Sequence, residues 1–373
     1  MRSINKYLSI SLIISAAVLI FQCETKERFY RPDVPQKLCT VGIFDIDDTI
    51  LYDFINFWQG EKDTLVFARY ISFEKSFQFE YSEEINDSLR GLSFRISNEN
   101  ADMFIYHSNH KIKRFEMILP NSLMFESGRK YFLHASEEET PAISAETEVP
   151  ELPPTLSLLS VKTELITLDK PIIYNCLGDE WFYAVNTEIE FSFLNDNPNS
   201  YYAILLIGSV SDSLHQYPFF LQQGSGLLDF TVLETNTEGF LYNFQGRKTI
   251  RSVCPTSNSI DFRFDPTIAY FIDGSKIPGQ NCTLKILTQY QNGTTIPHFC
   301  RSFLIRLISI PEELYLFEKS LYTYRKVSDD PFAEPANLKG NIKGGNGIFA
   351  ICRNRELIVY PDSTIPYYNH PKN

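Results

Sequence analysis

Short segments in which apolar and polar residues alternate recur along this chain from residue 37 onward, and they constrain its fold more than any other feature. Residues 92–96 and 188–193 each alternate in this way. Because successive side chains of a β-strand point to opposite faces, a period of two marks a strand with one buried and one wet face. Residues 202–207 are apolar throughout, as in a strand buried on both faces. The 30 Phe and 21 Tyr suit such pleated surfaces, so we expect a mainly β protein.

The strand-like segments fall into two groups, separated by an acidic stretch that contains prolines. Residues 137–139 are three consecutive glutamates, and prolines follow at intervals up to position 154. Such a composition has little apolar area to bury, so it is typical of a linker between domains. We therefore expect two β-sandwich-like domains: an immunoglobulin-like one at 37–150 and a larger β-rich one at 151–373.

One segment of the second domain, residues 311–326, has helical instead of strand periodicity. Pro311 suits a first helical turn, and the two glutamates that follow it complement the positive end of the helix dipole. Apolar and aromatic side chains then recur along one helical face, at Leu314, Phe317, Leu321 and Tyr324. We expect this single amphipathic helix to pack against the core rather than to bind a partner.

The first 36 residues have the pattern of a secretory signal followed by a tether. Two basic residues precede a mostly apolar run at 7–21, which is short for a membrane-spanning helix. Cys23 follows almost directly and charged residues come after it, so this region resembles a bacterial lipobox. The resemblance implies a signal peptide at 1–22 that is removed, a diacylglycerol on the thiol of Cys23, and a tether at 23–36.

Gln22 departs from the lipobox pattern, in which a small residue precedes the cysteine. Two alternatives therefore stay open: an ordinary cleaved signal in which the cysteine is coincidental, and a short uncleaved anchor. We prefer lipidation because the apolar run is short and ends abruptly in charge. Each buried methylene of an acyl chain contributes about 0.8 kcal/mol, so two or three chains would hold the protein on a membrane without spanning it.

Six cysteines remain after Cys23, at positions 39, 176, 254, 282, 300 and 352. An even number in an exported protein permits disulfides, although six cysteines allow many connectivities. Cys282 and Cys300 lie in neighbouring strand-like segments joined through a turn, so this is the first disulfide that we expect. Buried free thiols are the alternative. None of the six forms a Cys-x-x-Cys pair, which argues against a zinc or redox site.

Residues 44–51 end an apolar strand in the pattern Asp-x-Asp-x-Thr. They resemble the first motif of the haloacid dehalogenase phosphatases, and the resemblance would make Asp45 the nucleophile and Asp47 the acid/base. That family needs a parallel sheet with crossover helices, whereas the residues that follow have strand periodicity only. The later acidic pair Asp329–Asp330 stands in a turn setting before a proline. Aspartates between strands are also ordinary turn residues, so a phosphatase is the minor alternative.

The net charge of −12 argues against nucleic acid as a partner, because phosphate contacts need clustered Lys and Arg and no basic stripe is present. The six histidines are scattered and show no spacing typical of a metal site. Residues 344–347, Gly-Gly-Asn-Gly, lack the lysine of a phosphate-binding loop and are expected to form a turn into a strand. We therefore expect no catalytic, cofactor-binding or metal-binding residues.

Three stretches near the C-terminus resemble the closing signature of one lipoprotein family. They are residues 316–321, 330–335 and 340–349. The family is domain of unknown function 4249, from the Bacteroidetes, and weaker similarity to it extends over 193–202 and 271–280. The resemblance implies an outer-membrane lipoprotein, often encoded beside a TonB-dependent transporter, with no established activity.

These observations lead us to expect a lipid-anchored outer-membrane protein with a non-catalytic accessory or binding role. The resemblance implies a TonB-dependent transporter as the partner and leaves the ligand open. The alternatives are an envelope phosphatase that uses Asp45 and Asp47, and a purely structural envelope lipoprotein. Glutamates at 24 and 27 resemble the acidic surface-export signal of that phylum, so we expect the cell surface ahead of the periplasmic face.

Overall fold

The computed structural model describes residues 36–47, 52–55, 62–65, 69–76, 88–120, 122–174, 179–211, 218–222, 228–251, 263–291, 299–327 and 338–360. Strands dominate these ranges, and α2 (Glu312–Val327) is the single α-helix within them. The expectation of a mainly β protein is thereby confirmed. In the same ranges, no helix combines the length and the apolar character needed to cross a membrane.

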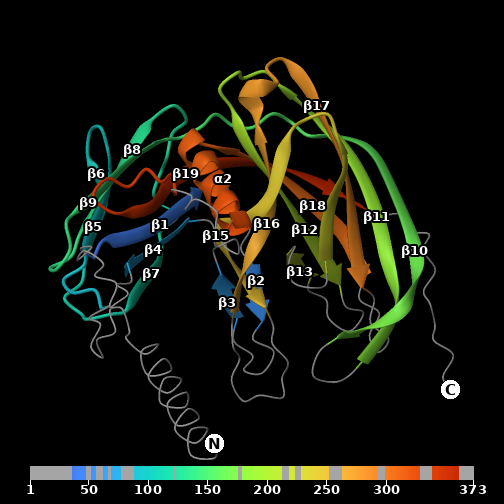
Figure 1. Ribbon diagram of the computed structural model, residues 1–373, viewed down its shortest axis with the longest axis horizontal. Coiled ribbons are helices and arrows are strands. Elements are labelled where there is room, and N and C mark those ends of the chain that lie inside the picture. Colours follow the sequence, from blue (N-terminus) through green and yellow to red (C-terminus); the bar gives the residue numbers. More distant parts are fainter. Residues whose placement is uncertain are drawn as a thin grey trace, which may run out of the picture.

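Most strands belong to three sheets (Figure 1). The strands are β1 (Leu38–Asp45), β2 (Tyr52–Ile55), β3 (Lys62–Leu65), β4 (Arg69–Lys75), β5 (Ser93–Asn98), β6 (Asp102–His107), β7 (Arg114–Ile118), β8 (Lys130–Ser136), β9 (Ile143–Glu148), β10 (Ser157–Tyr174), β11 (Asp179–Asn195), β12 (Tyr201–Ser211), β13 (Pro218–Gln222), β14 (Leu228–Thr235), β15 (Gly239–Arg251), β16 (Arg263–Asp273), β17 (Gln280–Gln291), β18 (Phe299–Ile310) and β19 (Asn346–Val359). A nine-stranded sheet has the order β15-β16-β12-β18-β19-β1-β4-β7, with β13 paired to β12. The four-stranded sheets are β6-β5-β8-β9 and β10-β11-β17-β14, and β2 pairs with β3.

The sheet β6-β5-β8-β9 packs against one end of the nine-stranded sheet. Phe94 of β5 and Tyr131 of β8 share a core with Phe73 of β4 and Phe349 of β19. The ring centroids of Phe73 and Phe94 lie 5.0 Å apart, so the two sheets contact each other directly through aromatic rings. The alternating sequence of β5 thus has the role expected of it, and the two layers form a first sandwich.

The sheet β10-β11-β17-β14 packs against the other end of the nine-stranded sheet. Phe191 of β11 and Leu284 of β17 share a second core with Tyr202 of β12 and Leu307 of β18. The sandwich-like arrangement expected from the sequence is therefore present twice, while the immunoglobulin-like topology of the first sandwich stays a prediction.

α2 covers the opposite face of the nine-stranded sheet, over its middle (Figure 1). Leu314 and Phe317 of the helix join Leu205 of β12 and Ala350 of β19 in a third core. These helix residues belong to the predicted apolar face, and the observed helix differs from the predicted span 311–326 by one residue at each end. The expected role in core packing is confirmed for Leu314, Phe317 and Leu321, whereas Tyr324, the last residue of the predicted face, is 46 % exposed.

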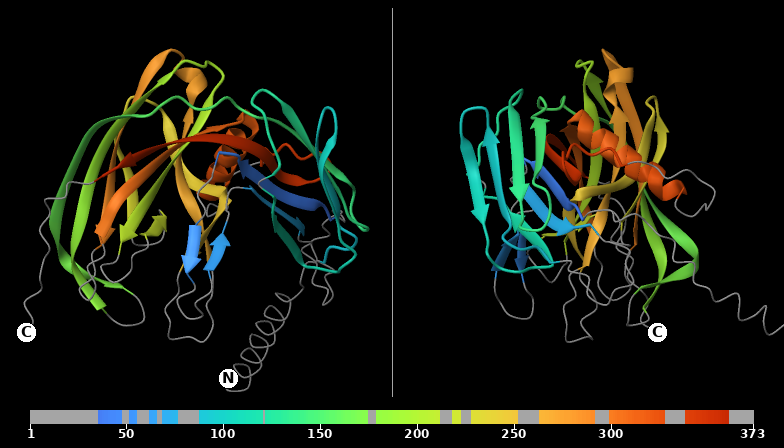
Figure 2. Two further views of the ribbon diagram at one scale, coloured as in Figure 1. Left: turned by 180° about the vertical axis from the view of Figure 1, so that it is seen from behind. Right: turned by 60° about the vertical axis from the view of Figure 1, so that its left-hand side comes forward.

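β19 joins the two sandwiches, because its two halves pair with different strands. Its first half runs parallel to β1, in a register that ends with Cys352 opposite Asp45. Its second half runs antiparallel to β18, starting with Arg353 opposite Ser309. Figure 2 shows this long strand passing through the middle of the molecule. The nine-stranded sheet therefore contains strands from both sides of residue 150. The division into domains 37–150 and 151–373 stays a prediction.

The acidic stretch that we expected to be a linker contains a strand. β9 pairs with β8 along its whole length, and Ile143, Ala145 and Thr147 point inward and are buried. Because two of these inner residues are small or polar, the average composition of the stretch conceals their alternation. The connection between the sandwiches is shorter than predicted, and it comprises residues 149–156.

Candidate functional site

Asp45, the nucleophile in the phosphatase alternative, lies at the end of β1, where β19 leaves β1 and joins β18. Its carboxylate is buried, and its Oδ1 accepts a hydrogen bond of 2.6 Å from Nδ2 of Asn354. Its Oδ2 lies 3.9 Å from a guanidinium nitrogen of Arg306. Arg306 is fully buried and donates from Nε to Glu356 at 2.7 Å. The buried guanidinium is therefore neutralised from two strands, as a buried charge requires.

Asp47 is bound by residues of β19, the strand that also binds Asp45. Its Oδ2 accepts hydrogen bonds from Nε of Arg353 at 2.7 Å and from the backbone N–H of Asn354 at 3.0 Å. Arg353 also donates to Oγ of Ser127 at 2.6 Å. Burial lowers the pKa of Arg69, and the charges of Asp45 and Asp47 oppose that shift. We call the set Asp45, Asp47, Arg69, Arg306, Arg353, Asn354 and Glu356 the seam network.

The seam network favours a structural role for the two aspartates. A phosphatase nucleophile must reach an open site, whereas Asp45 is only 5 % exposed and is bound by Asn354. β1 is parallel to β19 but antiparallel to β4, which differs from the parallel sheet that the phosphatase motif requires. The network instead fixes the point at which β19 changes partner.

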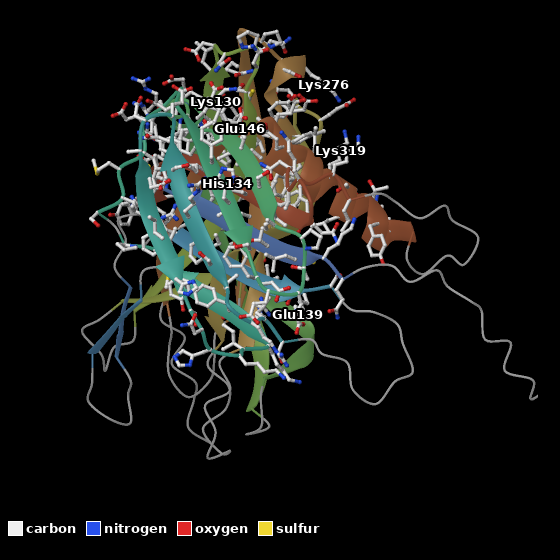
Figure 3. The ribbon with its side chains drawn as sticks, turned by 90° about the vertical axis from the view of Figure 1, so that its left-hand side faces the viewer. Lys130, His134, Glu139, Glu146, Lys276 and Lys319 are labelled. Atoms are coloured by element: carbon white, nitrogen blue, oxygen red, sulfur yellow. The ribbon has the colours of Figure 1, made fainter. Side chains whose placement is uncertain are left out.

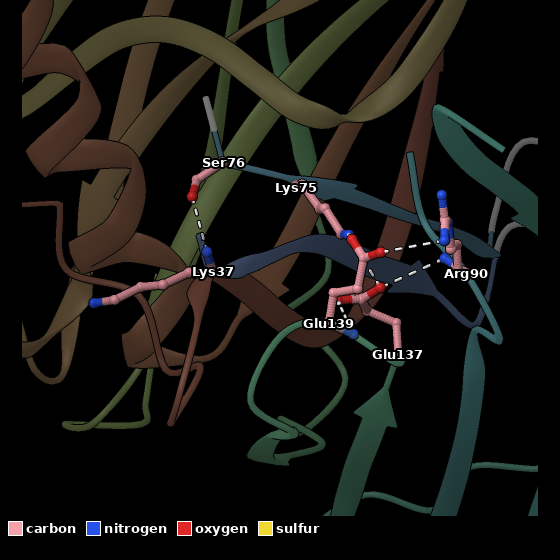
Figure 4. A network of polar contacts seen from close by, with 6 residues as sticks. All are labelled: Lys37, Lys75, Ser76, Arg90, Glu137 and Glu139. Carbon is pink, nitrogen blue, oxygen red and sulfur yellow. Dashed lines mark hydrogen bonds and ion pairs between the residues drawn. The ribbon is translucent and has the colours of Figure 1, made fainter. Parts of the chain in front are cut away.

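A second charged cluster lies where the chain enters the described fold, directly after the predicted tether (Figure 4). The backbone N–H of Lys37 donates to Oγ of Ser76 at 2.9 Å. Lys75, which precedes Ser76 in the sequence, has a fully buried side chain. Its Nζ lies 3.2 Å from Oε2 of Glu137 and 2.6 Å from Oε2 of Glu139. These two glutamates belong to the stretch that we expected to be a solvated linker. They instead tie the end of β8 to β4, beside the entry of the chain.

The turn predicted at 344–347 is present only at Gly344 and Gly345, because β19 already begins at Asn346; we use the word turn for residues 340–345 together with the first residues of β19. Asn341 makes three side-chain hydrogen bonds: Nδ2 donates to the carbonyls of Glu146 and Phe349, at 2.9 and 2.7 Å, and Oδ1 accepts from the N–H of Phe349 at 2.9 Å. Gly347 has φ +117°, and a Cβ there would lie 1.8 Å from the carbonyl oxygen of Thr40. The turn, which belongs to the closing signature, therefore joins β9, β19 and β1.

An open pocket of about 380 Å³ lies beside this turn. Residues 146–148 of β9 form one side and residues 340–343 the other, with Lys130 and Glu313 completing the lining. Lys343 exchanges backbone hydrogen bonds of 2.7 and 3.0 Å with Ser144 of β9. Two residues earlier, Asn341 bonds to β9 through its side chain instead of its backbone. The two segments separate at that point, and the pocket occupies the separation.

Charges of both signs line the pocket. Lys130 and Glu146 lie side by side at one end of the four-stranded sheet (Figure 3), with Nζ and Oε1 2.6 Å apart. The hydrogen bond to Lys130 lowers the pKa of Glu146, and the same bond raises the pKa of Lys130. Glu139, at the entry of the chain, lies near the other end of this sheet (Figure 3). Lys130 and Glu148 of the pocket thus lie at the opposite end of β8 and β9 from the entry of the chain, whereas Lys343 lies beside Ser144, near the entry end.

The structure does not bring the predicted disulfide cysteines together. Cys282 is buried and free, and it pairs in register with Phe193 within a four-stranded sheet. Cys300 lies opposite Val210 in the nine-stranded sheet. Cys23, the predicted lipid attachment site, lies outside the described residues. Within the described ranges, no group of three or more His, Cys, Asp or Glu side chains is arranged to hold a metal ion.

The sequence contained a signal for one of the clusters that we did not predict. Arg306 interrupts the otherwise apolar run 303–307, and a lone charge in such a strand indicates a buried ion pair. The pocket had no comparable signal, because it depends on where residues 340–343 separate from β9.

Comparison with protein families identifies one match. The family described as Domain of unknown function (DUF4249) matches residues 70–358. This range extends from the start of β4 almost to the end of β19, so it contains the pocket and the turn, and it begins after Asp45 and Asp47. A comparison with curated proteins finds no match.

Proposed function

The chain belongs to the DUF4249 family, and on this basis we propose that it is a lipid-anchored, non-catalytic binding protein of the bacterial outer membrane, accessory to a TonB-dependent transporter. In this proposal, Cys23 carries the lipid and residues 23–36 form the tether. The lipobox-like N-terminus and the resemblance of the closing signature to the Bacteroidetes family support the outer-membrane context.

The observation that carries the proposal is the separation of the pocket from the entry of the chain. The tether would deliver the chain to Lys37, beside the buried cluster of Lys75 and Glu137. The side of the pocket formed by Lys130 and Glu148 lies at the far end of β8 and β9. An anchored molecule of this shape can present the pocket away from its own attachment point, which suits a binding role.

The seam network supports a role without catalysis. Asp45 and Asp47 are the pair that most resembles catalytic residues, and both are engaged by side chains of β19. Carboxylates held in this way serve to position strands, because a buried arginine such as Arg306 needs them.

The test is an affinity pull-down of the tagged full-length protein from detergent-solubilised outer membranes, followed by mass spectrometry. We expect a stoichiometric TonB-dependent transporter and an acylated peptide that begins at Cys23. The Cys23→Ala variant should lose the acyl group and leave the membrane fraction. Reversing the pocket charge with Glu148→Lys and Glu313→Lys should remove the transporter, since both side chains line the pocket.

The matched control is Glu238→Lys, because the side chain of Glu238 is 90 % exposed and lies outside the pocket lining. This variant should retain the transporter. Recovery of the protein alone, from all variants, would contradict the accessory role. Hydrolysis of p-nitrophenyl phosphate that disappears in Asp45→Asn, with the fold intact, would establish the phosphatase alternative instead.

A further inference from the structure

The edge of β9 is open at Glu148, where it borders the pocket. Ser144 exchanges both of its backbone hydrogen bonds with Lys343, so even-numbered residues of β9 turn their N–H and C=O groups away from β8. Glu146 and Glu148 share this orientation. The carbonyl of Glu146 is bound by the side chain of Asn341. No backbone group among the described residues pairs with Glu148 on that side, so its donor and acceptor face the pocket.

The pocket lining also carries a net negative charge, because the three glutamates Glu146, Glu148 and Glu313 are accompanied by only two lysines, Lys130 and Lys343. Glu146 is neutralised by Lys130. Glu148 and Glu313 line the same pocket, and neither forms an ion pair within the described part of the chain. The site therefore combines the outward backbone donor and acceptor of Glu148 with the carboxylates of Glu148 and Glu313, and Lys343 lies in the same lining.

We propose that the pocket binds an extended peptide segment of the partner protein, which adds as a strand to the edge of β9 and places basic side chains against Glu148 and Glu313. This inference rests on the proposed function and specifies how the partner is recognised. A peptide backbone presents donors and acceptors at the spacing of a strand, which matches the outward groups of Glu148. Alternate side chains of an added strand point to one face, so lysines two residues apart can reach the carboxylates together.

The probe is a fluorescein-labelled capped peptide, Val-Lys-Val-Lys-Val, titrated with the purified full-length protein in detergent and measured by fluorescence anisotropy. Two control peptides isolate the two parts of the interaction. Val-Glu-Val-Glu-Val reverses the charge, and Val-Lys-Pro-Lys-Val removes a backbone donor and disfavours pairing. We expect saturable binding of the lysine peptide and at least ten-fold weaker binding of both controls.

Two substitutions of Glu148 distinguish the contribution of its backbone N–H to peptide binding from that of its charge. Glu148→Pro removes both the charge and the outward N–H, and it leaves the ladder to β8 intact because that N–H is not part of the ladder. Glu148→Gln removes only the charge. We expect Glu148→Pro to abolish binding, Glu148→Gln to weaken it several-fold, and Glu238→Gln, at an exposed turn outside the pocket, to leave it unchanged. Circular dichroism of each variant checks that the sheet is retained.

Equal binding of the lysine and glutamate peptides, or binding that neither Glu148 variant changes, would overturn the proposal. The same variants distinguish it from the accessory role itself. A transporter that co-purifies equally with wild type and Glu148→Pro overturns strand addition and leaves the accessory role standing. Conversely, if no transporter co-purifies but the lysine peptide binds with the expected pattern, the edge site stands and the accessory role fails.

Discussion

Asn354 donates a hydrogen bond of 2.6 Å to Asp45, across a separation of 309 residues in the sequence. The bond lies where β19 has finished pairing with β1 and begins to pair with β18. The backbone N–H of Asn354 also donates to Asp47. One residue thus binds both aspartates of the phosphatase-like motif and holds the strand that joins the sandwiches.

Asp45→Asn is predicted to lower the free energy of unfolding, because Asp45 has a structural role. Asparagine keeps the shape of the side chain, but it leaves the fully buried Arg306 with less negative charge around it. Breaking a buried pair in this way costs about 3 kcal/mol, so the midpoint of urea unfolding should fall clearly. The matched control is Asp102→Asn, whose partner Arg95 is half exposed, with a loss below about 1 kcal/mol. Equal losses in both variants would show that the seam network has no special role.

The strands were predictable from the sequence because their signal is local. The alternation at 92–96 and the helical face from Leu314 to Leu321 depend on neighbours within a few residues, and both were confirmed. The shared sheet was not predictable, because nothing near Asn346 in the sequence indicates that it pairs with Cys39. A contact over that separation is decided by the packing of the whole chain.

Gly347→Ala is predicted to prevent folding. The residue has φ +117°, which an L side chain rarely adopts, and its Cβ would lie 1.8 Å from the carbonyl oxygen of Thr40. Since neither backbone can move without breaking the β1–β19 ladder, the expected result is loss of soluble protein. Gly279→Ala is the control, with φ +68° and no atom within 4 Å of the new Cβ. It should cost about 1–2 kcal/mol, measured as a lowered Tm. Soluble, stable Gly347→Ala would contradict this account of the turn.

Thr187→Val and Thr288→Val are predicted to stabilise the second sandwich. The two threonines lie opposite each other on β11 and β17, both are buried, and neither hydroxyl has a hydrogen-bond partner in the described structure. Valine has nearly the same shape and removes the buried polar atom, so each change should add about 1 kcal/mol to the free energy of unfolding in urea. Thr40→Val is the opposite control, because its hydroxyl donates to the carbonyl of Ser72 at 2.8 Å. Destabilisation by all three would refute the argument.

In the candidate sites, too, features that depend on neighbouring residues could be predicted, whereas contacts between residues far apart in the sequence could not. The expected pairing of Cys282 with Cys300 depends only on the turn that joins their segments in the sequence. β17 and β18 lie in two sheets that face each other, but Cys282 lies near Tyr202, at the start of β12, whereas Cys300 lies opposite Val210, near the end of β12. The glutamates at 137–139 have the composition of a solvated linker, but Glu137 and Glu139 bind the buried Lys75. The sequence does not indicate this contact, because Lys75 lies more than 60 residues away.

The thiol of Cys282 is predicted to be unreactive in the native protein and to make it sensitive to alkali. Burial raises its pKa from 9.0 to about 11. Because the folded-state pKa lies above the unfolded value, this thiol contributes stability that is fully present below about pH 9 and is lost as the pH rises through 11. The free energy of unfolding should therefore fall over this window, and the fall should be shallower in Cys282→Ala. In the native wild type, Cys282 should resist Ellman's reagent at about pH 8 and react after unfolding, because the thiolate is the reactive form. Non-reducing peptide mapping that finds Cys282 joined to Cys300 would reverse this expectation and restore the disulfide.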